Sequence, residues 1–429
     1  METLAKNSHG LWAATAIEAP ETRPLKHDHE TDVAIIGAGF TGLNAALALR
    51  AAGRDVTVLD AGEIGQGCSG RNGGQVNPGW KMDLGEISSH YGRDYAEHAL
   101  NLAKSAVPAL SSLIRGEGLR CEFIENGYVQ GAVGEKGLAS INQRAAQWVE
   151  QGISAEILSP QASADLLGTE AYDGVMLHSQ GGNLHPLSYA RELGRLVIEH
   201  GGAIFTGSRA LWVTEGDDQL AVVTDGGTLY AKSLLLATNG YTDLLWPGLS
   251  QSVVSVASAL SATAPLSPEK AEAILPGRHS VSETRRIQVY YRMTEDRRFV
   301  IGGRGATFGA AEKSSTAEVR RIARRYFPAL ETAEWTHDWA GTVAMTWDHA
   351  PKLMRLADRV YAGMGYNGRG VAMATAMGHQ LARALLGEPT NLPITPLYKT
   401  PFHAFRKLGI FGTVLKGRML DAMDQRSRR

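Results

Sequence analysis

The chain has 429 residues, of which 44% are hydrophobic and 20% charged, and its formal net charge is −1. This length is too great for one small core and suits two domains, and the near-neutral charge gives no reason to expect nucleic acid as a partner. The two cysteines, Cys68 and Cys121, form neither a metal motif nor a disulfide framework. We therefore expect no metal site and a reducing, cytoplasmic location.

The sequence shows no sign of a signal peptide or of a membrane-spanning helix. The first thirty residues are charged and lack an apolar run, so we expect an irregular arm rather than a signal peptide. No stretch approaches the roughly 18 apolar residues of a membrane-spanning helix.

Residues 31–60 predict a βαβ unit. The apolar run 32–36 is typical of a buried parallel strand, 43–52 predict an Ala/Leu-rich helix, and 56–59 predict a second buried strand that ends at Asp60. A GxGxxG motif joins the first strand to the helix. It consists of Gly37, Ala38, Gly39, Phe40, Thr41 and Gly42.

The motif and Asp60 together predict a site for the ADP part of a dinucleotide. Gly37 permits a tight turn, Gly39 lets a pyrophosphate approach the backbone, and Gly42 lets the helix pack on the strand. The helix N-terminus adds free N–H groups and about +0.5 of a charge. Asp60 follows Gly39 by 21 residues, where an acid holds the ribose hydroxyls. NAD and FAD share this arrangement, so other segments must decide between them.

A glycine-rich loop follows the second strand. We call residues 65–75 of it the glycine loop. Its glycines let a ligand approach the backbone closely, and its hydrogen-bond donors are Ser69, Arg71, Asn72 and Gln75. Because this loop begins just after Asp60, it is placed to run from the ribose toward a large head group.

In the rest of the chain, segments typical of a nucleotide-binding domain alternate with segments typical of an antiparallel sheet. We expect helices at 94–115, 136–151, 187–200, 314–327 and 371–386, and strands at 121–124, 127–132, 203–206, 210–214, 220–224, 228–230, 233–237, 287–293, 299–301 and 360–362.

This order predicts an α/β protein with a discontinuous Rossmann-like nucleotide-binding domain and an antiparallel-sheet α+β substrate domain inserted twice. The predicted parts are an N-terminal arm 1–30; the nucleotide-binding domain at 31–85, 175–245 and 340–388; the substrate domain at 86–174 and 246–339; and a C-terminal extension 389–429.

A second GxGxxG lies at Gly363, Gly365 and Gly368. A second dinucleotide site is disfavoured, because the position 21 residues after Gly365 is Leu386 and no strand follows the helix. We expect instead that this helix N-terminus faces an electron-rich part of the cofactor, such as the N1–C2=O edge of a flavin.

Taken together, these segments resemble the glycine oxidase/D-amino-acid oxidase superfamily of FAD-dependent enzymes, and most closely its gamma-glutamylputrescine oxidase group. The segments that carry the resemblance are Leu11–Thr15, 33–42, 69–75, 182–186, 289–293, 301–303 and 363–370.

The resemblance implies a glutathione-reductase-like FAD-binding domain with FAD buried between two domains. Gly37 to Gly42, Asp60 and Ala61 would hold ADP, and Leu211 would meet adenine through its backbone. The glycine loop would hold the ribityl chain and flavin through Gly67, Ser69, Gly70, Arg71, Asn72, Gly73 and Gly74. The pyrophosphate and pyrimidine edge would lie near Thr238, Asn239, Gly240, Gly363, Asn367, Gly368, Arg369, Gly370 and Val371. Cys68 is expected to be buried and inert, so we expect non-covalent FAD.

Other side chains are weighed for the substrate pocket. Tyr290 and Tyr291 point to opposite sides of a strand, and we assign Tyr291 to the pocket wall together with Trp347 and Arg71. His185 is expected to be structural, with a substrate or flavin-loop contact as the alternative. The basic tail 399–429 is expected to dock on its own domain, with a membrane surface as the alternative.

These residues predict oxidation of an amine by hydride transfer to flavin, with O₂ as the expected acceptor and no obligatory general base. An amino-acid dehydrogenase that passes electrons to quinone and a dinucleotide-binding module without turnover are the alternatives. The amine itself and the oligomeric state are left open.

Overall fold

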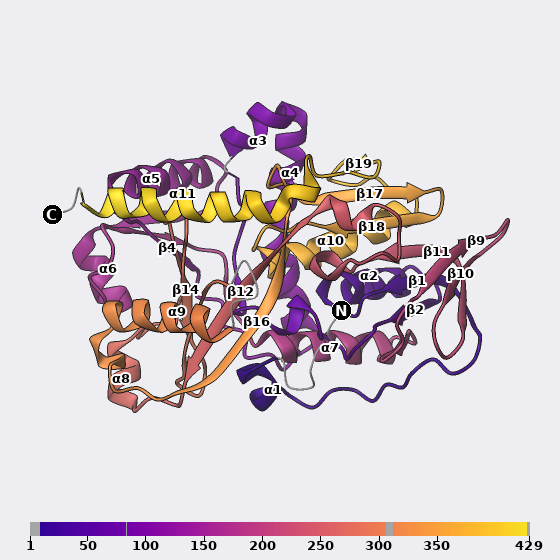
Figure 1. Cartoon of the computed structure of the whole chain (residues 1–429), viewed down its shortest axis with the longest axis horizontal. Coiled ribbons are helices and arrows are strands. Elements are labelled where there is room, and N and C mark those ends of the chain that lie inside the picture. Colours follow the sequence, from indigo (N-terminus) through magenta and orange to yellow (C-terminus); the bar gives the residue numbers. More distant parts are fainter. Residues whose placement is uncertain (1–8, 83, 306–311, 427–429) are drawn as a thin grey trace.

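The computed structural model describes residues 9–82, 84–305 and 312–426. Two large sheets lie side by side, each with helices packed on it, and the chain crosses between them several times (Figure 1). The predicted combination of a parallel nucleotide-binding sheet with a mostly antiparallel second sheet is confirmed.

The first sheet has the order β19-β17-β18-β11-β1-β2-β8, with β10 and β9 attached beyond β11. Strands β11, β1, β2 and β8 run parallel to their neighbours; helix α2 forms the crossover from β1 to β2, and α7 leads into β8. The strands are β1 (His29–Ile36), β2 (Val56–Leu59), β8 (Ala203–Phe205), β9 (Trp212–Glu215), β10 (Leu220–Val223), β11 (Thr228–Leu236), β17 (Lys352–Ala357), β18 (Val360–Met364) and β19 (Ile394–Thr395).

Four helices form one core with this sheet. They are α2 (Phe40–Ala51), α4 (Arg93–Gly116), α7 (Pro186–Glu199) and α10 (Gly370–Leu385). Helix α2 contacts both α10 and α7, and α10 contacts α4. Gly378 permits the close approach of α10 to α2, since a Cβ there would lie 2.7 Å from the carbonyl oxygen of Thr41.

The second sheet has the order β16-β12-β15-β14-β13-β4-β6-β5 and is antiparallel except for the β13–β4 pair. Its strands are β4 (Tyr128–Gly131), β5 (Ala155–Leu158), β6 (Val175–His178), β12 (Val254–Thr263), β13 (Ser280–Glu283), β14 (Tyr290–Met293), β15 (Phe299–Arg304) and β16 (Trp335–Met345). Its helices are α5 (Gly134–Glu150), α6 (Pro160–Leu167), α8 (Pro268–Ala273) and α9 (Glu312–Tyr326).

Short elements complete the chain. A two-stranded ribbon pairs β3 (Gln75–Val76) with β7 (Gly182–Asn183). The others are α1 (Leu11–Thr15), η1 (Cys68–Gly70), α3 (Leu84–Tyr91), η2 (Asn239–Tyr241), η3 (Leu249–Ser252), η4 (Pro328–Leu330) and η5 (His403–Phe405).

Several predicted boundaries differ from the observed ones. Strand β6 lies in the second sheet, although 175–245 was assigned to the nucleotide-binding domain. Strand β16 belongs to the second sheet as far as Met345, although the nucleotide-binding domain was predicted to resume at 340. Helix α4 packs in the first core because its apolar face meets α10, although 86–174 was assigned to the substrate domain. Strand β19 belongs to the first sheet, within the predicted C-terminal extension.

Two predicted local structures also change. The predicted strand 121–124 contributes only a single bridge from Ile124 to Asn183, and the predicted strands 228–230 and 233–237 form one strand, β11. The N-terminal arm contains a docked helix, α1, whose Leu11 and Trp12 are fully buried. From residue 9 onward, the arm is therefore part of the packed structure.

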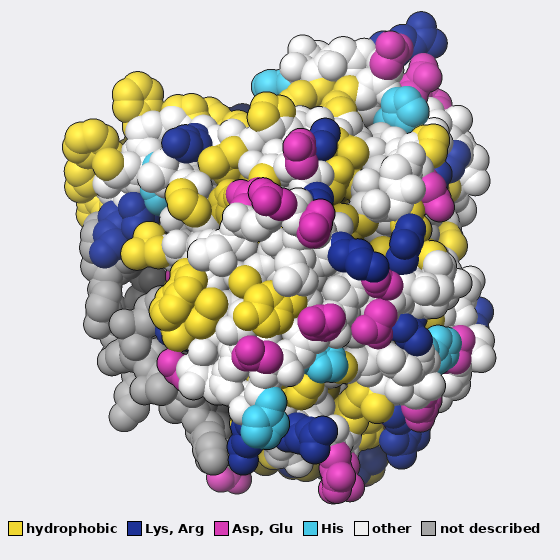
Figure 2. Space-filling model, turned by 90° about the vertical axis from the view of Figure 1, so that its right-hand side faces the viewer, with side chains coloured by type: hydrophobic (Ala, Val, Ile, Leu, Met, Phe, Trp, Pro, Cys, Tyr) yellow, Lys and Arg dark blue, Asp and Glu magenta, His cyan; other side chains and the backbone are white. Residues whose placement is uncertain are grey.

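We call the part of the molecule built on the first sheet the first domain, and the part built on the second sheet the second domain. The C-terminal helix α11 (Arg406–Arg426) runs along the outside of the molecule from the first domain to the second (Figure 1). Among the described residues, no helix is long and apolar enough to span a bilayer. The face at the outer end of the first domain carries acidic and basic side chains interspersed with one another (Figure 2).

Candidate functional site

A cavity of about 1270 Å³ lies between the two sheets. Its first half is lined by the start of α2, the glycine loop, η2 and the start of α10, and its second half by strands β12, β14 and β16. The C-terminal helix α11 also reaches the cavity, through Thr413 and Val414. The nucleotide-type sequence segments thus meet at one place, although they lie far apart in the chain.

The start of α2 supplies an anion-binding backbone. The N-cap, Gly39, has no side-chain hydrogen bond, and the amide of Phe40 donates to Ser69 Oγ over 3.0 Å. A Cβ on Gly42 would lie 2.0 Å from the carbonyl oxygen of Gly37, so the third glycine is required for the turn itself. The other N–H groups of this first turn have no partner within the helix, and Gly39, Phe40 and Thr41 line the cavity.

Asp60 ties two loops together at the cavity wall. Its two carboxylate oxygens accept hydrogen bonds from the amides of Ala38 and Gly62, both over 2.8 Å. Burial raises the pKa of Asp60, and these two hydrogen bonds oppose the rise. Each carboxylate oxygen has a further lone pair, which suits the ribose hydroxyls that the spacing predicted.

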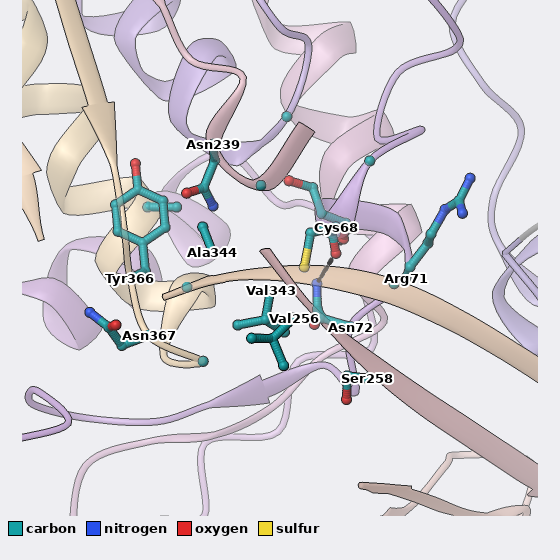
Figure 3. Close-up of a pocket in the computed structure, with 18 of the residues that line it drawn as sticks. Cys68, Arg71, Asn72, Asn239, Val256, Ser258, Val343, Ala344, Tyr366 and Asn367 are labelled. Carbon is teal, nitrogen blue, oxygen red and sulfur yellow. Dashed lines mark hydrogen bonds between the residues drawn. The ribbon is translucent and has the colours of Figure 1, made fainter. Parts of the chain in front are cut away.

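The glycine loop is folded by Asn72. Its amide nitrogen donates to the carbonyls of Cys68 and Ser69 over 3.0 and 2.9 Å, and its amide oxygen accepts from the amide of Gly74 over 2.7 Å. Cys68 and Asn72 lie together in this loop (Figure 3). Burial raises the pKa of the Cys68 thiol to about 11, so the thiol is neutral at pH 7.

Two buried tryptophans support the loop from behind. Trp12 of α1 donates its indole N–H to the carbonyl of Asn72 over 2.8 Å, and Trp339 of β16 donates to the carbonyl of Arg71 over 2.9 Å. The two rings meet edge to face with centroids 5.6 Å apart. Sequence reasoning missed this support; its signal was the apolar pair Leu11–Trp12 in an otherwise charged arm.

The start of α10 forms the opposite end of the cofactor half. The N-cap, Arg369, makes no side-chain capping bond, and Gly368, Gly370 and Val371 line the cavity. Arg369 itself donates to the carbonyl of Pro78 and lies over the ring of Tyr128 at 5.7 Å. A second helix N-terminus therefore faces the same cavity, with a cationic side chain beside it.

Asn367 holds the turn before α10 in a left-handed conformation, with φ of 53°. Its side-chain oxygen accepts from the amide of Thr346 over 2.9 Å, and its nitrogen donates to the carbonyl of Gly365 over 2.6 Å. Asn239 accepts from the amide of Gly365 over 2.9 Å. Asn239 and Asn367 lie near Tyr366 on the same side of the site (Figure 3).

Most of the residues that the sequence assigned to the cofactor line this cavity. They are Gly37, Gly39, Phe40, Thr41, Asp60, Ala61, Gly67, Ser69, Arg71, Asn72, Gly73, Thr238, Asn239, Gly240, Asn367, Gly368, Arg369, Gly370 and Val371.

Six assigned residues lie behind the wall. Ala38, Gly42, Gly70, Gly74 and Gly363 shape the turns and packing beneath it. Leu211 does not line the cavity itself, and its amide donates to the carbonyl of Val223 over 2.8 Å, while its neighbours Arg209 and Ala210 line the cavity; its backbone contact with adenine stays a prediction.

The assignment of Tyr291 to the pocket wall is contradicted by its position. Tyr291 is buried in the core of the second domain and donates to Tyr172 over 3.0 Å. Tyr290 lines the cavity, with its hydroxyl 2.9 Å from Ser258 Oγ and its ring against Gly73. Strand alternation allowed either choice, and only the packing of β14 decided it.

Trp347 is also displaced from its predicted position. Its side chain is 65% exposed outside the cavity, whereas its neighbours Met345 and His349 line it. Arg71 lines the cavity, but its Nε donates to the carbonyl of Gln66 over 2.9 Å, and its side chain points away from Val256 and Val343 (Figure 3). We therefore assign Arg71 to the support of the glycine loop.

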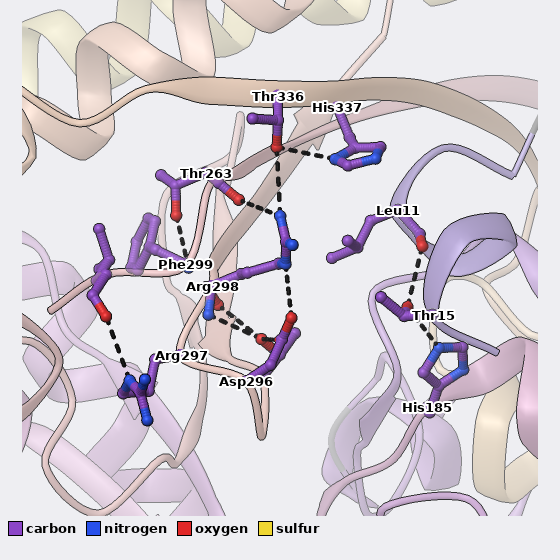
Figure 4. Close-up of polar contacts among 12 residues, drawn as sticks. Leu11, Thr15, His185, Thr263, Asp296, Arg297, Arg298, Phe299, Thr336 and His337 are labelled. Carbon is purple, nitrogen blue, oxygen red and sulfur yellow. Dashed lines mark hydrogen bonds and ion pairs between the residues drawn. The ribbon is translucent and has the colours of Figure 1, made fainter. Parts of the chain in front are cut away.

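His185 has the structural role that was expected for it. Its Nδ1 accepts from the amide of Ser188 over 3.1 Å, so the neutral ring presents Nε2–H to Thr15 Oγ at 3.0 Å (Figure 4). Thr15 in turn donates to the carbonyl of Leu11 over 3.0 Å. Burial lowers the pKa of His185 to about 3, so the ring is neutral and joins α1 to α7.

The cavity also has a cationic wall, which sequence reasoning did not find. Lys81, Arg144 and Arg369 lie near one another in its lining, and Arg304 of β15 lines the cavity as well. None of the four forms an ion pair with a carboxylate within the described residues. Burial and the guanidinium groups of Arg369 and Arg144 lower the pKa of Lys81 to about 8. The four residues lie on four separate segments, so no sequence pattern joins them.

Among the described residues of the second sheet that line the cavity, Glu283 carries the one carboxylate. It pairs with Arg285 over 3.0 Å and accepts from the hydroxyl of Tyr326 over 2.9 Å. The cavity thus contains the N-termini of α2 and α10 and the Asp60 carboxylate, which suits a ribose, together with a wall of positively charged side chains. This arrangement suits a long diphosphate-linked cofactor at one end and an anionic group at the other.

Comparisons with known proteins agree with this geometry. A family model described as FAD dependent oxidoreductase, DAO, matches residues 32–384. The chain is 30% identical over 384 residues to the probable oxidoreductase OrdL of Haemophilus influenzae, covering 88% of each chain. It is 28% identical over 405 residues to the gamma-glutamylputrescine oxidoreductase of Escherichia coli, covering 92% of this chain and 94% of that one.

Solved structures show the same fold. Glycine oxidase from Geobacillus kaustophilus is similar with a TM-score of 0.71 and 21% identity, covering 85% of this chain and 97% of that one. L-proline dehydrogenase from P. horikoshii is similar with a TM-score of 0.71 and 18% identity, covering 86% of this chain and 96% of that one.

Proposed function

Because the chain belongs to the DAO family of FAD-dependent oxidoreductases, of the amine and amino-acid type, we propose a specific reaction for it. The protein oxidises a primary amine whose other end carries a carboxylate, and a gamma-glutamylputrescine-like amine is the favoured substrate. O₂ is the proposed electron acceptor, and the FAD is held without a covalent bond.

The residues present fit FAD. Two helices start at the cavity without side-chain caps, and an elongated space runs between them past Asp60 and the glycine loop. A Cβ on Gly39 would lie 2.8 Å from Ser69 Oγ, so only glycine at this position lets the start of α2 and the glycine loop lie this close together. In this arrangement α2 would hold the pyrophosphate, Asp60 the ribose, and α10 the pyrimidine edge of the flavin.

The cationic wall is the observation that favours a carboxylate-bearing substrate. Arg144 donates to Gln130 over 3.1 Å, and Arg304 has a buried Nε without a hydrogen-bond partner. A guanidinium that lacks a carboxylate partner binds one well, since such hydrogen bonds are charge-assisted. Putrescine alone would bring only positive charge to this wall, whereas a glutamyl group brings a carboxylate.

The reacting amine must be neutral, so that its lone pair can form the C=N bond. A primary amine resembles Lys, with a pKa of about 10.4, and roughly one molecule in 10³ is neutral at pH 7. The positive wall and the apolar side chains of Val256 and Val343 both disfavour the ammonium form. Bound FAD supplies the acceptor for the hydride that leaves the carbon next to nitrogen. Water then converts the imine to an aldehyde and ammonia, and the proposed reduction of O₂ gives H₂O₂.

Initial rates of O₂ consumption test this proposal with gamma-glutamylputrescine, putrescine and N-acetylputrescine. We expect kcat/KM for the carboxylate-bearing amine to exceed the others by roughly tenfold to a hundredfold, the worth of one charge-assisted hydrogen bond. Arg304→Met should remove this preference, while Arg93→Met, on the exposed side of α4, should keep it.

Equal kcat/KM for the three amines would overturn the substrate assignment. Reduction of an artificial electron acceptor without O₂ consumption would overturn the oxidase assignment, and would favour a dehydrogenase that passes electrons to quinone.

A further inference from the structure

The C-terminal helix α11 and the short turn η5 before it expose an unusual concentration of large apolar side chains. Twelve large hydrophobic side chains are exposed among the described residues, and six of them lie between positions 402 and 419. Each of these six is at least 52% exposed. They are Phe402, Phe405, Leu408, Phe411, Leu415 and Met419. The other six are scattered over the molecule, as is normal for a protein surface.

The exposed apolar residues of α11 lie on one face. At about 100° per residue, Leu408, Phe411, Leu415 and Met419 fall within an arc of roughly 80°. We call this set, together with Phe402 and Phe405, the apolar stripe. A continuous stripe of this kind on a long helix marks an interaction surface.

The opposite face of α11 is held by the protein. Asp421 accepts hydrogen bonds from the amides of Arg286 and Ile287 over 3.2 and 3.1 Å and pairs with the Arg286 guanidinium over 3.0 Å. A Cβ on Gly417 would lie 3.2 Å from Ile287, and Val414 lines the cavity. The helix is therefore docked on one side, and the apolar stripe faces outward as a fixed feature.

The charges around the stripe decide which partner it fits. Lys407 and Arg418 lie along one edge of the stripe and Lys416 along the other, by the same 100° spacing, and all three are exposed. The sequence from 389 to 420 contains no Asp or Glu. In contrast, the surface at the outer end of the first domain interleaves both signs (Figure 2).

We propose that α11 binds the protein to a bilayer surface that contains anionic phospholipid, with the apolar stripe in the headgroup region and the flanking basic side chains on lipid phosphates. An apolar face with Lys and Arg along its edges is the pattern of helices that lie in a membrane interface. A second copy of the chain fits less well, because two such helices would bring their basic edges together. The helix does not cross the bilayer, and the docking is peripheral.

This placement has a consequence for the site. Thr413 and Val414 line the cavity, so a bilayer bound to the outer side of α11 would lie about one helix diameter, roughly 10 Å, from the cavity wall. The proposed membrane docking does not depend on which electron acceptor or which amine the enzyme uses, and it is tested separately from activity.

Co-sedimentation of the FAD-loaded full chain with vesicles tests the proposal. We expect binding to vesicles of phosphatidylcholine with 30% phosphatidylglycerol to be at least about tenfold stronger than to phosphatidylcholine alone, and to weaken as NaCl rises. The variant Leu408→Ser/Leu415→Ser should lose at least about tenfold of this binding. Lys407→Gln/Lys416→Gln should lose the preference for anionic vesicles.

The matched control is Val149→Ser/Leu244→Ser, which removes two exposed apolar side chains elsewhere, at 57% and 89% exposure. It should bind vesicles as the unaltered protein does. Because all four substituted apolar side chains are exposed, the flavin spectrum and the thermal unfolding temperature should be the same in every variant. Equal binding by Leu408→Ser/Leu415→Ser and the control would overturn the proposal. So would a dimer in vesicle-free solution that this variant disrupts, since a second copy would then occupy the stripe.

Discussion

Replacement of Asp60 by asparagine should weaken FAD binding and loosen the loops around it. The carboxylate accepts the amides of Ala38 and Gly62 over 2.8 Å each. Asparagine keeps one carbonyl oxygen for one of these amides and turns an NH₂ group toward the other. One backbone N–H therefore loses its acceptor, which costs about 1–3 kcal/mol of the free energy of unfolding of the apoprotein.

The loss in FAD affinity is separate from this cost. A charge-assisted hydrogen bond from a ribose hydroxyl contributes roughly 1.5–3 kcal/mol. At about 1.4 kcal/mol per factor of ten, the dissociation constant of FAD should rise about tenfold to a hundredfold. Quenching of flavin fluorescence during titration of the apoprotein measures this constant, and thermal unfolding of the apoprotein measures the stability cost.

The control is Asp55→Asn, which makes the same chemical change at the other end of β2, away from the cavity. Asp55 is 54% exposed and its ion pair with Arg50 is long, at 3.4 Å. This variant should bind FAD as the unaltered protein does, because an exposed pair contributes little. A dissociation constant for Asp60→Asn within twofold of the unaltered protein would refute the placement of the ribose at Asp60.

Three further predictions concern the cofactor, the reaction and the second domain. Acid or heat should release FAD into the supernatant, as absorbance at the flavin band measures; colour that remains on the precipitate would contradict non-covalent binding. The kcat/KM of amine oxidation should rise toward alkaline pH as the free amine deprotonates, and a flat profile up to about pH 10 would contradict a neutral reacting amine. Burial raises the pKa of Glu283 to about 7, against the lowering effect of Arg285, so the folded protein holds this proton more tightly than the unfolded chain does. The contribution of Glu283 to stability should therefore fall as pH rises from about 4.5 to 7. Denaturant unfolding of Glu283→Gln should lack this fall, and parallel pH dependences for the two proteins would contradict it.

The cofactor half of the site was predictable because its determinants are local. The strand, the glycine turn, the helix start and Asp60 lie within residues 32–60, and each follows from backbone sterics and hydrogen bonding over a few residues. The resemblance to FAD-dependent enzymes rests on such segments, and the family match confirms it. The uncapped start of α10 at Gly370 was likewise visible as a glycine turn before an Ala-rich helix.

The substrate half was decided by the tertiary structure alone. Strand alternation placed Tyr290 and Tyr291 on opposite faces, but only the packing of β14 turned Tyr290 toward the cavity. Trp347 was assigned to the pocket by its resemblance to a stretch near the flavin in related enzymes, yet the turn after β16 exposes it. The cationic wall joins residues from 81 to 369 that no motif links. Contacts between distant segments depend on how sheets and helices pack, and a single sequence gives the residues without showing which of them come into contact.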